Sequence, residues 1–168
     1  MDEVSKDLVR IFFELKGFLV NSKTSLLVKK PRVSKSSAES FVLNAGTIIN
    51  VHQALVDVKP WHAETFFPSV IKSSPEMFRF MEPENLKNAG SFFENKKFKK
   101  IIVLSKLPNV RGTLKKSIAL LKQNGIDHVL EIPVILNYLI SHVKTNLNHT
   151  DSKALQFIRI FKCYDLYK

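Results

Sequence analysis

An acidic and a basic residue stand two positions apart at the end of an apolar run, in the sequence Asp57-Val58-Lys59. The run over residues 54–56 predicts a mostly buried strand, and Pro60 predicts its end. Since side chains two apart on a strand point to the same face, Asp57 and Lys59 are expected to project together. A carboxylate can hold Mg²⁺ or Mn²⁺ there, and an ammonium beside it can orient or activate a water for phosphodiester hydrolysis.

The chain is strongly basic, and its charge is uneven. Its 168 residues carry a net charge of +11, with a pI of about 9.8. The segment Lys87–Lys122 holds ten Lys and Arg against one acid, and Lys16–Lys35 holds six with no acid. This imbalance predicts a polyanionic partner, nucleic acid before an anionic membrane. The alternative is an ordinary solvated surface in a lysine-rich protein.

Two groups of basic residues are the candidate contacts to a nucleic-acid backbone. Lys96, Lys97, Lys99 and Lys100 lie just before and within a predicted strand. Arg111 and Lys115 flank Gly112-Thr113, where a predicted helix begins and could offer its amides to a phosphate; a plain helix cap is the alternative. Such contacts would give affinity without reading sequence.

Composition excludes several other classes of protein. A hydrophobic content of 45% with thirteen Phe argues against disorder, and the length predicts one domain spanning residues 1–168. The single cysteine, Cys163, excludes an internal disulfide, fits an intracellular protein and is expected to be a buried small hydrophobe. No run reaches membrane-spanning length, and we expect no signal peptide. Phosphate-loop, dinucleotide and nucleophile-elbow motifs are absent.

Hydrophobic periodicity and punctuation by Gly and Pro predict the order of elements along the chain. A first helix is expected to end before Gly17, and Phe-rich residues 61–83 are expected to form a partly helical excursion over the sheet. Thr150 is the expected cap of the last helix. Helices are predicted over residues 3–16, 84–96, 113–124 and 133–143, and a last helix is predicted to run up to 163. Strands are predicted over residues 18–20, 26–28, 40–44, 47–51, 53–59, 100–105 and 127–131. The strands before residue 60 are expected to form an antiparallel meander.

The order of a helix, a three-stranded meander, a helix, a strand, a helix and a strand resembles the PD-(D/E)XK, or restriction-endonuclease-like, nuclease superfamily. The similarity covers roughly residues 3–131, and Asp57-Val58-Lys59 stands where that family has its acid-x-Lys sequence. The resemblance implies an α/β fold with a mixed central sheet flanked by helices. It also implies Mg²⁺ or Mn²⁺ at Asp57 and charge stabilisation by Lys59.

The same family places an Asp on the preceding strand as a second metal ligand, and this chain departs from that pattern. Within residues 38–44, Ser40 occupies the position of the Asp, and Glu39 is one residue out of register. Glu39 could serve as a metal ligand and catalytic acid if a bulge re-aims it. Acids of the first helix, Glu3, Asp7 and Glu14, are further alternatives.

Three functions therefore follow from the sequence. The first is a metal-dependent nuclease acting on DNA through Asp57, Lys59 and Glu39, with a homodimer as one alternative for its assembly. The second is a catalytically degenerate member of the same fold that serves as a nucleic-acid-binding or protein-assembly module. The third is a protein–protein module with the Phe-rich stretch as its interface.

Overall fold

A computed structural model describes residues 2–22, 25–30, 40–43, 47–59, 64–93, 97–149 and 152–166. Within 40–43 and 47–50 it describes the backbone alone. The helices are α1 (Asp2–Leu15), α2 (Pro68–Ser73), the 3₁₀ helix η2 (Pro75–Met81), α3 (Pro83–Phe92), α4 (Arg111–Gln123), α5 (Ile132–His142) and α6 (Lys153–Cys163). The strands are β1 (Leu19–Ser22), β2 (Leu26–Lys29), β3 (Ser40–Leu43), β4 (Thr47–Asn50), β5 (Gln53–Lys59), β6 (Lys99–Leu104) and β7 (His128–Glu131).

A five-stranded mixed sheet in the order β1-β2-β5-β6-β7 forms the centre of the fold. β1, β2 and β5 pair antiparallel, whereas β5, β6 and β7 pair parallel. The parallel pairs are joined by helical crossovers, as parallel strands require. The predicted α/β class with a mixed, helix-flanked sheet is therefore confirmed.

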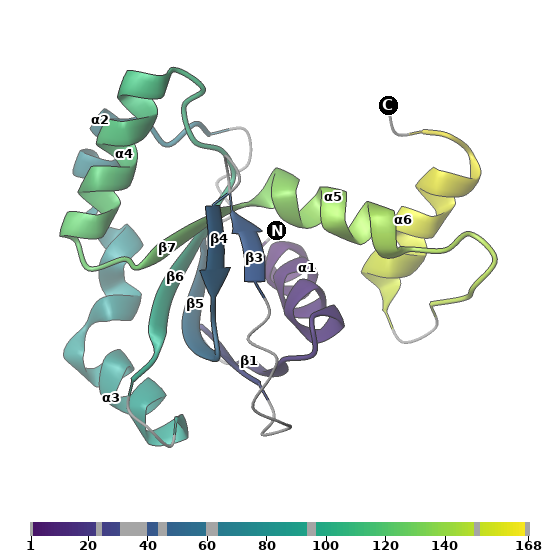
Figure 1. Cartoon of the computed structure of the whole chain (residues 1–168), viewed down its shortest axis with the longest axis horizontal. Helices are drawn as coiled ribbons and strands as arrows, with labels where there is room; N and C mark the ends of the chain where they lie inside the picture. The colour runs from purple at the N-terminus through teal and green to yellow at the C-terminus, as the bar shows by residue number, and fades with distance from the viewer. Residues whose placement is uncertain are drawn as a thin grey trace.

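Helices cover both faces of this sheet (Figure 1). On one face, α1, α5 and α6 pack against alternate strand residues that include Val28, Val56 and Val103. On the other face, α2, η2, α3 and α4 pack against Leu55, Ile102 and Leu104. The period of two along β5 and β6 thus divides the apolar side chains into two clusters with the sheet between them.

The ends of several helices follow from local sequence. Gly17 and Gly125 adopt φ values of +77° and +86° just after α1 and α4, which a residue with a Cβ adopts only with strain. Pro133 lies in the first turn of α5, where its missing N–H costs no hydrogen bond. The cap of α6 is Ser152, whose Oγ accepts a hydrogen bond from the Leu155 N–H at 3.2 Å. The predicted cap Thr150 lies outside the described residues.

The prediction of one continuous meander up to residue 59 is wrong. β3 and β4 pair antiparallel with each other in a separate two-stranded sheet, and β5 pairs with β2 instead. Figure 1 shows this small sheet beside the central one. The segment 30–52 is thus inserted between two strands that are neighbours in space, because a non-local pairing replaces the sequential one.

Two further expectations concern aromatic residues and the cysteine. The excursion after β5 is partly helical as predicted, with α2 and η2, and its Phe66, Met77 and Phe80 are buried in the core. Those three side chains therefore stabilise the fold and do not form an interface. The prediction that Cys163 is buried is wrong: it is exposed, because α6 turns Leu155 rather than Cys163 towards the core.

Candidate functional site

Asp57 and Lys59 lie on one face at the end of β5, as the spacing predicts. Lys59 Nζ is 2.7 Å from Asp57 Oδ2, and the two side chains are 19% and 8% exposed. Both residues alternate with the buried Val56 and Val58, which face α1 and α5. The ion pair therefore points to the opposite face, towards the side of the sheet that α2 and α4 cover.

The antiparallel neighbour of β5 beside Asp57 is β2 and not the predicted strand over residues 40–44. The register pairs Leu26 with Val56, so that Ser25 stands opposite Asp57. The Ser25 hydroxyl donates to Asp57 Oδ1 at 3.4 Å, a long and weak hydrogen bond. Ser25 thus stands on the strand beside Asp57, whereas Ser40, the predicted neighbour, belongs to the separate β3–β4 sheet.

The acids of the first helix do not join this site. α1 packs on the face of the sheet that Val56 and Val58 line, and the Asp57 side chain leaves by the other face. Asp7 and Glu14 instead accept hydrogen bonds from Arg10, and the bond to Asp7 is the main reason why the pKa of Arg10 is raised. Glu39 lies outside the described residues.

The described residues around Asp57 supply fewer oxygen ligands than a divalent ion needs. Mg²⁺ takes about six oxygen ligands. Here the described side chains supply one carboxylate and the Ser25 hydroxyl, and Asp57 Oδ2 is buried with Lys59 as its counter-charge. Among the described residues, no three His, Cys, Asp or Glu side chains are grouped to hold a metal ion. This part of the chain does not by itself make a magnesium site.

The basic residues of two distant segments meet at the opposite end of the sheet, where β5, β6 and β7 begin. Lys29 pairs with Gln53 in the β2–β5 ladder, and Gln53 Nε2 donates to the Lys97 carbonyl at 2.6 Å. Lys99 pairs with Ala54, the second residue of β5. We call the following residues the basic end: Lys29, Lys30, Lys97, Lys99, Lys100 and Lys122.

His128, at the start of β7, lies near the charges of Lys99, Lys122 and Asp127. Its pKa is lowered, first by burial and then by the positive charge of Lys99; the negative charge of Asp127 opposes this, and Lys122 adds the smallest lowering effect. Asp127 also accepts from the Lys100 N–H at 2.7 Å and lies 3.8 Å from Lys100 Nζ. The last turn of α4 and the first residues of β6 and β7 therefore share one electrostatic environment.

Arg111 and Lys115 lie at the other end of the sheet, so the predicted contacts do not form one surface. They belong to the first turns of α4, which follows the end of β6. Leu104 comes five positions after Lys99 on β6, a length of about 17 Å at 3.3 Å per residue. The cap of α4 is Val110, which makes no side-chain hydrogen bond. Lys96 lies outside the described residues.

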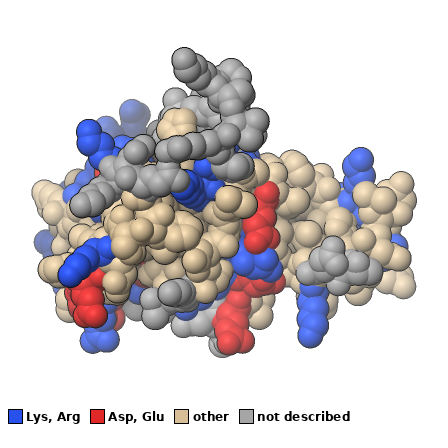
Figure 2. All heavy atoms as spheres, turned by 90° about the horizontal axis from the view of Figure 1, so that it is seen from below, with Lys and Arg blue, Asp and Glu red and all other residues tan. Residues whose placement is uncertain are grey.

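Figure 2 views the molecule from below Figure 1, towards the end where β6 begins. Lys and Arg side chains lie on this side in several groups separated by neutral surface, with acidic side chains among them. On the described part of this face, the positive charge is distributed and not gathered into one continuous patch. Such a distribution fits spaced contacts along a charged backbone better than a pocket for one small anion.

Sequence reasoning missed Ser25, Lys122 and His128 as neighbours of the candidate residues. Ser25 precedes the apolar run 26–28, but nothing local shows which strand that run will face. Lys122 and His128 approach Lys99 because α4 returns along the sheet. Their meeting depends on the crossover and has no signal in the sequence.

No family model, curated protein or solved structure matches the chain. Within the described ranges, no helix is long and apolar enough to cross a membrane.

Proposed function

We propose that the chain is a nucleic-acid-binding module on a restriction-endonuclease-like fold, and the part of the chain that the structure describes does not supply the full set of metal ligands. The support for the fold is the strand order. Once β3 and β4 are set aside as an insertion, α1 is followed by three antiparallel strands and two parallel ones, with Asp57 near the end of the third. This is the order that the resemblance implies.

The observation that carries the binding function is that Lys29, Lys30, Lys97, Lys99 and Lys122 lie at the same end of the sheet, the basic end, although they come from segments far apart in the sequence. Lys30 and Lys97, which come from the two basic segments, are more than sixty positions apart in the sequence. Each ammonium that neutralises a phosphate releases a condensed counterion, so that binding weakens with salt. A surface of this kind holds a nucleic-acid backbone without recognising bases.

Two matched triple variants test this proposal. The first changes Lys97, Lys99 and Lys122 to Gln at the basic end. The second changes Arg111, Lys115 and Lys116 to Gln, which removes the same charge from exposed positions at the start of α4. Binding of a fluorescent duplex of arbitrary sequence would be followed by anisotropy over a series of salt concentrations.

If each of the three lysines contacts one phosphate, the first variant lowers the slope of log K against log salt by about 2.7, at about 0.9 per contact. A fourfold rise in salt then weakens binding about 40-fold less than in the wild type. The second variant is expected to keep the wild-type slope. Equal slopes in the two variants, or a wild type that binds no duplex, would contradict the proposal.

A metal-dependent nuclease is the second candidate function. The observation that favours it is that Asp57 and Lys59 lie side by side at the end of a central strand, as an acid-x-Lys site requires. The observation against it is that Lys59 already neutralises the one carboxylate of the described site. Cleavage of supercoiled plasmid with Mg²⁺ or Mn²⁺, compared between wild type and Asp57→Asn, distinguishes the two functions.

A further inference from the structure

The last helix, α6, is apolar on two opposite sides. Leu155 on one side is buried against the rest of the fold. On the other side, four large side chains at helical spacing form an exposed row that we call the α6 stripe: Phe157, Ile160, Phe161 and Tyr164. They are 61%, 42%, 36% and 72% exposed, and the rings of Phe157 and Phe161 meet edge to face at 4.8 Å. A solvent-facing side of a helix is normally polar.

We propose that the α6 stripe is a dimer interface, in which α6 of a second copy of this chain packs antiparallel against it. The spacing supports a second copy as the occupant. Positions 157, 160, 161 and 164 are symmetric about the midpoint between 160 and 161, and an aromatic residue stands at each end. A two-fold axis through that midpoint brings Phe157 of each chain against Tyr164 of the other, which makes the self-complementary surface that a two-fold dimer needs.

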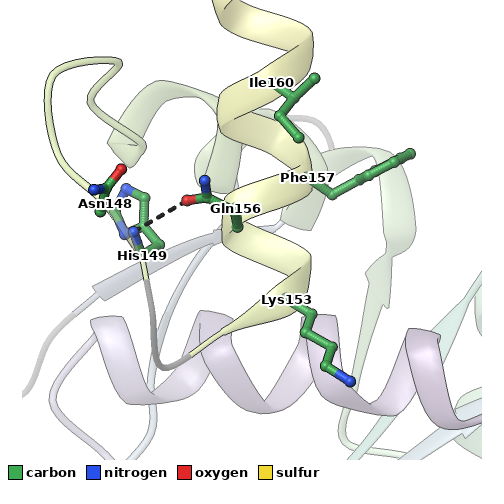
Figure 3. Close-up of a pocket in the computed structure, with 6 residues that line it drawn as sticks. All are labelled: Asn148, His149, Lys153, Gln156, Phe157 and Ile160. Carbon is green, nitrogen blue, oxygen red and sulfur yellow. Dashed lines mark hydrogen bonds between the residues drawn. The ribbon is translucent and has the colours of Figure 1, made fainter.

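A pocket beside the stripe offers a place for an aromatic side chain. It has a volume of about 450 Å³ and lies at the N-terminal half of α6 (Figure 3). In the antiparallel pair the partner's Tyr164 reaches this level of the helix. Its ring would pack on apolar side chains and its hydroxyl would lie near polar ones, as aromatic anchors at interfaces do. The pocket is lined by Asn148, His149, Lys153, Gln156, Phe157 and Ile160.

Two of the three cations of α6, Arg159 and Lys162, favour a protein surface over a membrane or a nucleic acid, whereas the third, Lys153, lines the pocket. Arg159 Nε donates to the Thr145 carbonyl at 2.8 Å, and Lys162 Nζ donates to the Ile140 and Val143 carbonyls at 2.8 Å. These cations are held on the side of α6 that faces the fold, away from the stripe. An interfacial membrane helix instead aligns its Lys and Arg with the lipid headgroups. Burial of the stripe against a second copy therefore leaves these two cations with their carbonyl partners.

The area is sufficient for a weak but specific dimer. At roughly 200 Å² for a full side chain of this size, the four exposures leave about 420 Å² of apolar surface. If this is the apolar core of the patch, at about 65% of the whole, each copy buries about 650 Å² and the pair about 1,300 Å². That total exceeds the value of about 1,000 Å² expected of a biological interface.

Molar mass in solution is the first test. We expect the wild-type mass, measured by light scattering and sedimentation equilibrium over a wide range of protein concentration, to rise to that of two chains. Tyr164→Glu is expected to halve it, since a charge would enter the buried core. Val110→Glu is the matched control, because Val110 is 69% exposed and precedes α4. A wild type that stays monomeric, or a Tyr164→Glu variant that stays dimeric, would overturn the proposal.

Disulfide cross-linking tests the antiparallel arrangement. In a Cys163→Ser background, Ile160→Cys is expected to link two chains on mild oxidation, since position 160 lies beside the two-fold axis. Phe157→Cys is expected not to link, because the two copies of position 157 are about 10 Å apart along the helix at 1.5 Å per residue. Disulfides need Cα atoms within about 7 Å. A disulfide through position 157 would indicate parallel helices and overturn the arrangement. Monomers that sediment with anionic vesicles would assign the stripe to a membrane instead.

Discussion

The Asp57–Lys59 pair provides a sharp test of whether this site is structural or available for chemistry. Replacement of Lys59 by Met removes the counter-charge and leaves a carboxylate that is 8% exposed. Two unit charges 2.7 Å apart attract by about 6 kcal/mol at an effective dielectric constant of 20. Desolvation of the two ions opposes this by several kcal/mol each, so the pair itself contributes little net stability.

Breaking the pair from one side is different from removing it. In Lys59→Met the Asp57 carboxylate keeps only the 3.4 Å hydrogen bond from Ser25. Removal of one partner of a buried pair costs about 3–5 kcal/mol. Because Lys59 is 19% exposed and water reaches the site, we expect the lower value, about 3 kcal/mol, or about 6–12 °C in the unfolding temperature.

Asp57→Asn is expected to cost less, about 1 kcal/mol, because the long Lys59 side chain can turn its ammonium to water. The double variant Asp57→Asn with Lys59→Met is expected to lie within about 1 kcal/mol of the wild type, since no charge is left buried. Urea unfolding followed by circular dichroism gives these free energies. Lys72→Met, at an exposed position of α2, is the control and is expected to change stability by less than about 0.5 kcal/mol.

A loss of less than about 1 kcal/mol in Lys59→Met would refute the reasoning, because the carboxylate would then tolerate burial without its partner. A double variant as unstable as Lys59→Met would also refute it. Either result would mean that the ion pair with Lys59 does not stabilise the fold, so that Asp57 is available for another role.

Three further predictions concern the same molecule. Ser25→Asp puts a second carboxylate opposite Asp57, so we expect this variant to bind Mn²⁺ in calorimetry, whereas the wild type and Ser40→Asp do not. If Ser40→Asp binds Mn²⁺ and Ser25→Asp does not, the β2–β5 register does not define the neighbour of Asp57. Asp57→Asn is expected to leave duplex binding unchanged, because Asp57 lies at the far end of the sheet from Lys97 and Lys99; a large loss of affinity would place the nucleic acid at the carboxyl ends of the strands. The pKa of His128 is lowered from 6.5, mainly by burial, so that the unfolded chain binds the proton before the folded chain does as the pH falls. The free energy of unfolding should therefore decrease as the pH drops below about 6.5. His128→Gln should remove the contribution of His128 to this decrease, as measured by urea unfolding midpoints.

Local sequence was sufficient to predict the helices and strands, and to predict that Asp57 and Lys59 lie on the same face of their strand. The period of two along β5, Gly17 and Gly125 after helices, and Pro133 in a first turn each act over a few residues. Backbone sterics and side-chain alternation determine them whatever the rest of the chain does. For that reason α1, β5, β6 and α4 lie within two residues of their predicted limits.

The partners of those elements were decided by the tertiary structure. Whether β5 pairs with β4 or with β2 depends on which arrangement buries more apolar surface on both faces, a sum over the whole sheet. That pairing put Ser25, and not Ser40, opposite Asp57. The direction of α4 then brought Lys122 to Lys99 and left Arg111 at the other end of the sheet. Charge and residue type are properties of the sequence, but adjacency across non-local contacts arises only when the chain has packed.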